Sequence, residues 1–363
     1  MKRILSILAL LLLLAAAVVG GLAWWGWERL QTPHKGYLGA ETTVTLEPGT
    51  DAGTILRRLE AQGVIEDARL ARLWLVYGLG DPSLKAGEYR FSGALTTPEV
   101  LDQLIRGQVI TRQVTLIEGL TLEETADVLA AAGFGDRERY LEIFRSPALV
   151  ADLDPEAPDL EGYLFPETYR FTGGATEHDV AETLVGTFKD RWYERVAPLL
   201  ETEPSAAGGP PVRTVREVVT LASIVEKEAR IDEERPVIAG AFDNRLDEGM
   251  RLQADPTVIY ALKRRDTWDG NLRRPDLEMD SPYNTYRYPG LPPGPIASPG
   301  LASLEAAAAP ADVPYLYFVS RNDGSHVFAE TYAEHRRNVD RWQKQYWRER
   351  WARERAEGAE ENG

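Results

Sequence analysis

The N-terminal segment constrains the fold of this chain more than any other feature. From Ile4 to Trp25 the chain reads ILSILALLLLLAAAVVGGLAWW and carries no charge. As a helix, this run would be about 33 Å long, which is enough to cross the hydrocarbon core of a bilayer. Two basic residues precede the run, and Trp24, Trp25 and Trp27 at its end resemble an interfacial aromatic belt. We therefore predict a transmembrane anchor over residues 1–27, with its N-terminus in the cytoplasm.

A cleaved signal peptide is the competing interpretation of this segment. The apolar core of a signal peptide spans about 7–15 residues and is followed by small residues. Here the run is longer and ends in tryptophans. Both interpretations place residues 30–363 outside the cytoplasm. The expected location is the inner (plasma) membrane, with a single pass and the folded region on the extracytoplasmic side.

Composition excludes several classes of function. The 363 residues include 57 acidic and 41 basic side chains, which give a formal net charge of −16, whereas nucleic-acid binding usually requires a basic face. The absence of cysteine excludes disulfides and cysteine-ligated zinc. The four histidines are scattered, without the spacing of a metal site. We expect no nucleic-acid partner, no metal and no other cofactor.

Two segments of the chain share a strand–turn–helix pattern. After a polar linker over residues 28–43, residues 44–65 read as a short strand, a turn and a helix that ends near Gly63. Residues 114–135 repeat this order. The alternative to a repeated unit is that two generic patterns agree by chance. The positions that recur without gaps are Val44/Val114, Thr45/Thr115, Leu46/Leu116, Gly49/Gly119, Leu59/Leu129, Ala61/Ala131 and Gly63/Gly133.

The rest of the chain alternates helices and strands irregularly, which is typical of the α+β class. This pattern extends over residues 136–340, with its clearest break in the Pro-, Gly- and Ala-rich segment 201–211. A charged terminal helix is expected over residues 331–356. We assign residues 341–363 to a charged C-terminal helix and tail.

The stretch LASIVEKEAR (221–230) places Glu226 and Glu228 two residues apart at the end of an apolar run. On a helical wheel of residues 215–229, Glu226 falls in the apolar sector and Glu228 lies about 160° away, on the polar side. Two carboxylates that point in nearly opposite directions cannot act on one substrate bond. We expect Glu228 to lie in solvent or to pair with a neighbouring arginine.

The position of Glu226 on the apolar face has two explanations. Burial disfavours the charged form of a lone carboxylate, and a group that keeps its proton can donate it to a leaving group. Glu226 is then a candidate general acid. The alternative is a core glutamate satisfied by a buried arginine, such as Arg245 or Arg251.

Five long segments of the chain stand out as motifs. They are LASIVEKEAR, AFDNRLDEGMRLQADPTVIYAL (241–262), SPYNTYRYPGLPPGPIASPGLASLEAAAAP (281–310), PYLYFVSRNDGSHVFAETYAEH (314–335) and LEGYLFPETYRF (160–171). Together they resemble the endolytic murein transglycosylase (YceG-like) family, and the resemblance covers nearly the whole chain. It implies a LysM-like region over 44–135, made of one or more small α/β subdomains, and a mixed α+β catalytic domain over 136–340.

The resemblance also implies an activity. The family cleaves the β-1,4 bond between N-acetylmuramic acid (MurNAc) and N-acetylglucosamine (GlcNAc) inside nascent peptidoglycan strands. It leaves 1,6-anhydroMurNAc ends, so the implied enzyme is a lyase. The catalytic glutamate of the family motif matches Glu226. The implied partners are glycan strands, the membrane and the cell-wall elongation machinery, including peptidoglycan synthases.

The matching motifs supply candidate substrate-binding residues. Some are polar groups that would support the positive charge of the transition state. Two tyrosines would offer faces for sugar stacking, and one glutamate would line the cleft. Each also has a structural alternative, namely loop capping or hydrogen bonding in the core. The candidates are Gln253, Asp255, Asn284 and Tyr286 for charge support, Tyr260 and Tyr283 for stacking, and Glu167 for the cleft.

A lytic reaction needs only one carboxylate. Glu226 would protonate the glycosidic oxygen and then, as the carboxylate, take the proton from the C6 hydroxyl of MurNAc. Two alternatives remain. One is a muramidase-type hydrolase with Glu226 as acid and Asp255 as the base for water. The other is a non-catalytic peptidoglycan-binding scaffold protein that relies on residues 44–135.

Overall fold

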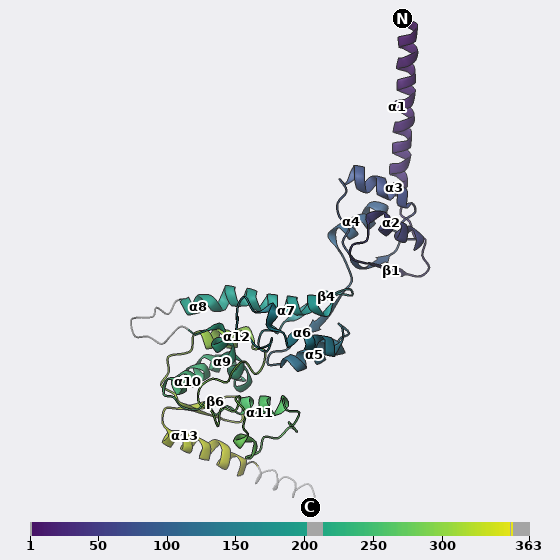
Figure 1. Cartoon of the computed structure of the whole chain (residues 1–363). Coiled ribbons are helices and arrows are strands. Elements are labelled where there is room, and N and C mark those ends of the chain that lie inside the picture. Colours follow the sequence, from purple (N-terminus) through teal and green to yellow (C-terminus); the bar gives the residue numbers. More distant parts are fainter. Residues whose placement is uncertain (1, 202–212, 349, 351–363) are drawn as a thin grey trace, which may run out of the picture. The chain divides into compact units, whose positions relative to one another are not determined.

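The computed structural model describes residues 2–201, 213–348 and 350 (Figure 1). Contacts divide the chain into two compact units. Unit 1 comprises residues 1–113 and 170–175, and unit 2 comprises residues 114–169 and 176–363. The division after Gln113 falls inside the segment that the sequence assigns to a single LysM-like region.

A long apolar helix, α1 (Lys2–Gln31), opens unit 1. Its stretch Leu10–Gln31 is long and apolar enough to cross a membrane. The helix continues through Gln31, so it extends into the segment predicted as a polar linker (28–43).

Unit 1 builds its core between one strand pair and its helices. β1 (Glu41–Leu46) pairs antiparallel with β2 (Gly87–Ser92), and Val44 lies opposite Tyr89. Alternate strand residues point inward because side chains alternate between the faces of a strand. They form one buried cluster with side chains of the helices. The helices are α2 (Ala52–Ala61), α3 (Ala68–Leu73), which continues as a wider turn (Trp74–Gly78), and α4 (Thr97–Arg106).

Residues 44–65 and 114–135, the two segments with a shared sequence pattern, both have the strand–turn–helix order. β1 leads to α2, and β3 (Thr111–Thr115) leads to α5 (Leu122–Ala131). The turn glycines Gly49 and Gly119 have φ of 79° and 78°, a left-handed conformation that favours glycine. Their strands pair differently, since β1 pairs with β2 and β3 pairs with β4 (Thr168–Thr172). The likeness to a LysM fold stays a prediction.

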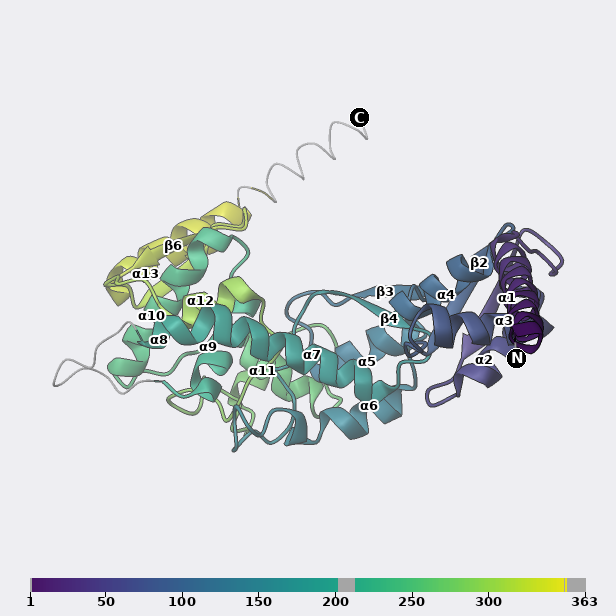
Figure 2. The same cartoon turned by 90° about the horizontal axis from the view of Figure 1, so that it is seen from above.

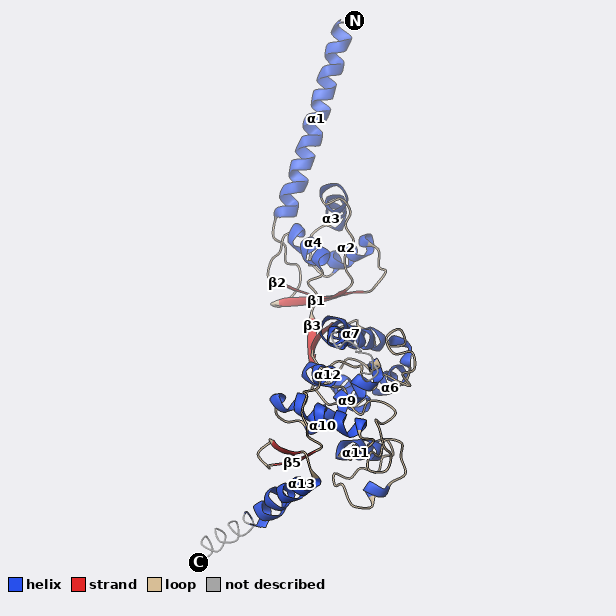
Figure 3. Cartoon of the chain, turned by 90° about the vertical axis from the view of Figure 1, so that its left-hand side faces the viewer, coloured by secondary structure: helices blue, strands red, loops and turns tan. Residues whose placement is uncertain are grey.

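Unit 2 is mainly helical, with short strands (Figures 2 and 3). The predicted mixed α+β class is confirmed. α7 continues through a wider turn (Trp192–Val196) into α8, and β5 and β6 form an antiparallel pair. The elements are α6 (Arg137–Phe144), α7 (Glu177–Arg191), α8 (Ala197–Glu201), α9 (Val215–Glu228), α10 (Arg235–Asp247), α11 (Asp255–Lys263), α12 (Leu301–Ala308), β5 (Tyr317–Ser320), β6 (His326–Ala329) and α13 (Tyr332–Val339).

Two predicted segments extend beyond the described residues. The expected terminal helix begins as α13 and continues through Asp340–Gln345, while residues 351–356 lie outside the described part. The predicted break at 201–211 also lies outside it, except for Glu201.

Helix α9 is the centre of unit 2. Thr214 caps its N-terminus in a capping box with Glu217. Every residue from Val218 to Val225 is buried. The helix packs against α10, α11 and α12. It is therefore covered on all sides from Val218 to Val225, whereas Glu217 and Lys227 on either side of this stretch are exposed.

Candidate active site

The side chain of Glu226 points inward, as its place on the helical wheel predicts, and both of its carboxylate oxygens accept hydrogen bonds. Oε2 accepts hydrogen bonds from the Gly300 backbone N–H at 3.0 Å and from the Ser303 hydroxyl at 2.8 Å. Oε1 accepts from Nη1 of Arg235 at 3.2 Å. The side chains of Glu226 and Arg235 are each only 8% exposed. Glu226 thus lies in a polar network at the start of α12.

Arg235 connects this network to neighbouring groups. Its Nη1 donates to the Ser303 hydroxyl at 2.7 Å, and its Nε donates to Asp232 at 3.0 Å. A third carboxylate, Glu118, lies 3.9 Å from Nη2. The sequence left open a core glutamate satisfied by a buried arginine. The structure contains such a pair, but the arginine is Arg235 rather than Arg245 or Arg251.

Glu228 does not lie in solvent, so that expectation was wrong. Its side chain lines a cavity of about 320 Å³. Burial, reinforced by the negative charge of Asp255, raises the pKa of Glu228 to about 7, while Arg245 opposes this shift. Within the described residues, its carboxylate has no hydrogen bond or ion pair. The cavity is lined by Glu228, Phe242, Arg245, Leu252, Gln253, Asp255, Tyr286, Phe318, Val319, Ser320, His326 and His335.

The cavity forms where α9 ends. Glu228 is the last residue of the helix, and Ala229 after it is extended. Side chains from α10, from the start of α11, from the β5–β6 pair and from α13 surround this end. Segments distant in sequence therefore cover the side of α9 on which Glu228 lies. A helical wheel considers only the residues of its own helix, which is why it placed Glu228 in solvent.

Three predicted substrate-binding residues lie in this cavity: Gln253, Asp255 and Tyr286. The Tyr286 hydroxyl donates to Oδ1 of Asp255 at 2.5 Å. Asp255 is the first residue of α11, and the capping position is Ala254, which makes no side-chain cap. Asp255 could also have capped the helix that follows it, but the structure shows that it does not. Gln253 has a φ of 51°, which is uncommon for a residue other than glycine and is often found at functional sites.

Arg245 supplies a positive charge to the same cavity. Its Nε donates to the Leu316 carbonyl at 2.6 Å, and its Nη1 donates to the Leu252 carbonyl. Its guanidinium lies over the Tyr317 ring, 5.4 Å from the centroid. Within the described part of the chain, no carboxylate forms an ion pair with it. Burial lowers the pKa of Arg245, and its charge attracts the ionised form of Glu228.

Two histidines that sequence spacing did not connect also line the cavity. His326 Nδ1 lies 2.7 Å from Oε2 of Glu234. Burial and the neighbouring charge of Arg245 lower the pKa of His335, which favours its neutral form. The two side chains come from β6 and α13, so no local motif in the sequence could have placed them beside Glu228.

The other predicted residues lie outside the cavity. Tyr260 is 4% exposed, and its hydroxyl donates to Glu161 at 3.0 Å, while its ring packs 4.9 Å from that of Tyr283. Asn284 is fully buried, and its amide donates to the carbonyls of Leu277 and Met279. These contacts correspond to the structural alternatives. Glu167 forms an ion pair with Arg191 at 3.5 Å.

Glu161 is a buried acid that the sequence reasoning missed. It is 2% exposed, and burial raises its pKa well above the usual range of a glutamate. It accepts from the Leu122 backbone N–H at 3.1 Å as well as from Tyr260. Leu122 opens α5 and Tyr260 lies in α11, and Glu161 is not among the residues that line the Glu228 cavity.

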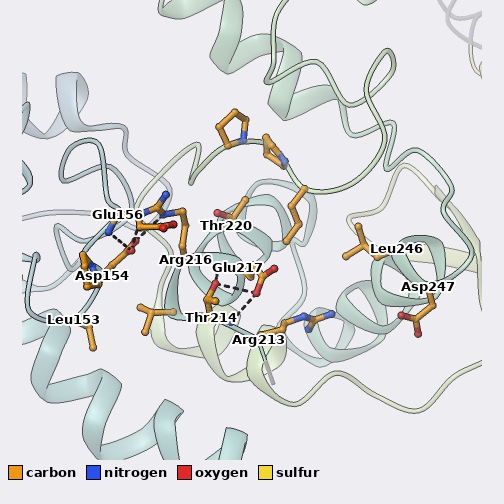
Figure 4. Close-up of a pocket in the computed structure, with 15 residues that line it drawn as sticks. Leu153, Asp154, Glu156, Arg213, Thr214, Arg216, Glu217, Thr220, Leu246 and Asp247 are labelled. Carbon is orange, nitrogen blue, oxygen red and sulfur yellow. Dashed lines mark hydrogen bonds and ion pairs between the residues drawn. The ribbon is translucent and has the colours of Figure 1, made fainter. Parts of the chain in front are cut away.

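The larger cavity in Figure 4 offers a weaker candidate site. It measures about 1050 Å³ and lies along the N-terminal half of α9. Asp154 is bound by Arg216 at 2.9 and 2.7 Å, and Glu217 is bound by Thr214 in the helix cap. Glu156 is exposed. Among its described lining residues, this cavity therefore has no partly buried, unpartnered carboxylate comparable to Glu228.

A metal-dependent site finds no support in the described residues. They contain no group of three or more His, Cys, Asp or Glu side chains suited to hold an ion. The prediction of no metal is untested by this and stays a prediction.

Comparisons with known proteins agree with the resemblance seen in the sequence. The YceG-like family model matches residues 44–341. A Bacillus subtilis (strain 168) protein named endolytic murein transglycosylase is 31% identical over 344 residues, which cover 90% of this chain and 91% of that protein. A Streptococcus pneumoniae (strain D39) protein of the same name is 29% identical over 327 residues. That match covers 82% of this chain but only 57% of the pneumococcal protein.

A solved structure supports the same grouping. The crystal structure of a YceG-like protein from Listeria monocytogenes matches with a TM-score of 0.55 at 31% identity. The match covers 82% of this chain and 98% of that one. The family model and the Bacillus relative each span most of the chain, and so this chain belongs to the YceG-like family.

Proposed function

We propose that this chain is an endolytic lytic transglycosylase of peptidoglycan. It would cleave the β-1,4 bond between MurNAc and GlcNAc within glycan strands and leave 1,6-anhydroMurNAc ends. The relatives named endolytic murein transglycosylase support this class of reaction. The single observation that carries the assignment to a site is Glu228, an unpartnered carboxyl with a pKa of about 7 in a cavity.

We assign the role of general acid to Glu228 rather than to Glu226. A general acid needs access to substrate and a pKa near the working pH. Glu228 meets both conditions. Both oxygens of Glu226 are occupied by Arg235, Gly300 and Ser303, and Glu226 does not line the cavity. Glu226, the candidate from the sequence, stays a prediction that the experiment below also tests.

The reaction proceeds in two proton transfers. Protonated Glu228 donates its proton to the glycosidic oxygen, and the bond between this oxygen and C1 of MurNAc breaks, so GlcNAc leaves with a hydroxyl. The Glu228 carboxylate then takes the proton from the C6 hydroxyl of MurNAc as O6 bonds to C1. No water is consumed, and Glu228 ends protonated, ready for the next bond.

Asp255 and Arg245 set the charge around this proton transfer. Asp255, held by the Tyr286 hydroxyl, supplies a negative charge that stabilises the positive charge that develops at C1. Its charge also raises the pKa of Glu228, while Arg245 limits this rise. A pKa near 7 lets one group serve as acid and then as base.

A muramidase-type hydrolase is the second candidate because Asp255 lies in the cavity of Glu228. In that reaction Glu228 would protonate the leaving oxygen and Asp255 would activate a water molecule. The products separate the two reactions, since anhydro ends are lighter than reducing ends by one water.

The test is digestion of purified sacculi by wild type, Glu228→Gln and Glu226→Gln, with end groups analysed by mass spectrometry. We expect wild type to release anhydro ends. Glu228→Gln should lose about 10²–10⁴-fold in rate, whereas folded Glu226→Gln should keep substantial activity. An active Glu228→Gln beside a folded but inactive Glu226→Gln would return the acid role to Glu226. Reducing ends from wild type would establish the hydrolase.

We further propose that α1 anchors the chain in the inner (plasma) membrane, with both units on the extracytoplasmic side. The length and composition of Leu10–Gln31 support the anchor, and the basic residues before the helix support the orientation. Peptidoglycan strands are the substrate on that side. Peptidoglycan synthases of the elongation machinery are the protein partners that the family resemblance suggests.

A further inference from the structure

The segment α3 with its following turn, residues 68–79, packs against the end of α1. The rings of Trp27 and Trp74 meet edge to face, with centroids 4.8 Å apart. A Cβ built on Gly26 would lie 3.7 Å from Leu70, at van der Waals contact. We call residues 68–79 the interfacial segment. These contacts hold it at the level of the last turns of α1.

An ion pair at the C-terminal end of α1 is consistent with the same arrangement. Arg29 of α1 donates to Glu66 at 2.7 Å, two residues before α3 begins. The contacts all belong to unit 1, so they describe one compact body. The position of the interfacial segment relative to α1 is therefore part of the fold of unit 1.

The helix geometry gives the depth of this segment in a bilayer. About 20 helical residues span the hydrocarbon core, and the apolar run starts at Ile4. The stretch Leu10–Gln31 contains the charged residues Glu28 and Arg29, so the uncharged run from Ile4 sets the depth. The core then ends close to Trp24, and Gly26 to Arg29 lie at the outer interface. Because the interfacial segment packs against these residues, it lies at the depth of the lipid headgroups.

The interfacial segment exposes apolar side chains at that depth. Leu70 and Trp74, four residues apart, face α1, whereas Leu73 and Tyr77 lie on an adjacent face of the helix. Leu73 is 54% exposed, Tyr77 84% and Leu79 40%. Among the described residues of unit 1 outside α1, the only other large hydrophobic side chain with comparable exposure is Leu38. This concentration on one short segment points to a surface that is covered in the membrane.

We propose that Leu73, Tyr77 and Leu79 insert into the outer interface of the lipid bilayer and hold unit 1 against the membrane. This inference rests on the proposed membrane anchor. Tyrosine and leucine suit the boundary between headgroups and acyl chains. Arg69 of the same segment is exposed and available to lipid phosphates. The β1–β2 pair lies on the side of unit 1 away from α1 (Figures 1 and 3).

The absence of cysteine from the chain makes a direct test possible. Single-cysteine variants of the full chain at Leu14, Tyr77 and Thr45 are labelled with an environment-sensitive fluorophore and placed in phospholipid vesicles. Leu14 lies in the middle of α1, and exposed Thr45 lies on β1. Quenching is measured with spin-labelled lipid and with iodide in the water. We expect lipid quenching at Tyr77 to approach that at Leu14 and to exceed that at Thr45 severalfold.

The outcomes separate this proposal from the anchor on which it depends. Lipid quenching at Leu14 with aqueous behaviour at Tyr77 overturns the proposal and leaves the anchor intact. No lipid quenching at Leu14 overturns both. Protection of Tyr77 from both quenchers shows that protein rather than lipid covers this residue and also overturns the proposal.

A second measurement avoids a label on Tyr77 itself. The reporter is placed at Leu79→Cys, and Leu73 and Tyr77 are both replaced by serine. We expect lipid quenching at position 79 to fall severalfold, while the matched exposed substitution Thr45→Ser leaves it unchanged. Equal quenching in both backgrounds overturns the proposal.

Discussion

Replacing Glu228 with glutamine should stabilise the protein, mainly at neutral and alkaline pH. Burial and Asp255 raise the pKa of Glu228 to about 7, compared with 4.5 for an ordinary glutamate. The folded state therefore binds this proton more tightly than the unfolded state. The stability that this tighter proton binding contributes is complete below pH 4.5 and is lost as the pH rises through 7. Above that, the buried charge costs the fold about 3 kcal/mol.

The size of the effect follows from this difference in pKa. Glutamine keeps the shape of the side chain and carries no charge that burial would penalise. Glu228→Gln should raise the free energy of unfolding by about 3 kcal/mol at pH 8 and by less than about 1 kcal/mol at pH 5. For a unit of this size, the gain at pH 8 corresponds to a rise in Tm of about 6–12 °C.

Glu226→Gln is the matched control because it makes the same chemical change two residues away. It removes the charge that pairs with Arg235, so we expect it to destabilise the fold by about 1–3 kcal/mol at both pH values. Thermal unfolding of the full chain in detergent, followed by circular dichroism at pH 5 and pH 8, measures both variants. The reasoning fails if Glu228→Gln lowers Tm at pH 8, or raises it equally at both pH values.

Three further predictions concern the same region. Release of anhydro ends should fall about tenfold per pH unit above pH 7, as Glu228 loses its proton; a rate that keeps rising to pH 9 would contradict this. Tyr286→Phe frees Asp255 and should lower kcat about tenfold with little change in KM or Tm, because the lost hydrogen bond positions a charge; an unchanged kcat would remove this role. Arg235→Met leaves Glu226 buried without its cation and should destabilise the fold by about 3–5 kcal/mol at pH 8, which a Tm equal to wild type would refute.

Sequence reasoning identified the helix that carries both candidate acids, Glu226 and Glu228, but it could not compare the surroundings of their carboxylates. The helical wheel correctly placed the side chain of Glu226 on the inward face of α9, where it is 8% exposed, because that face follows from the apolar period of the helix. It could not show that Arg235 and Ser303 occupy the carboxylate. Nor could it show that Phe318 and His335 enclose Glu228, because these contacts come from strands and helices far along the chain.

The candidate binding residues show the same limit. The motifs pointed to Gln253, Asp255 and Tyr286, and all three lie beside Glu228. The same motifs also contained Tyr260 and Asn284, whose hydrogen bonds lie within the protein. A motif contains both the residues of a site and those that support it. Only the direction of each side chain in the fold separates them.

The Glu228 cavity also has a consequence for the order in which the molecule matures. Its walls include Phe318, Ser320, His326 and His335, which belong to elements near the C-terminal end of the chain. A chain is synthesised from its N-terminus, so α1 and unit 1 are complete before β5 and β6 exist. Until those strands fold, Glu228 remains open to water and lacks the environment that raises its pKa. With the role proposed for Glu228, a partly synthesised chain would therefore lack a general acid with a pKa near neutrality.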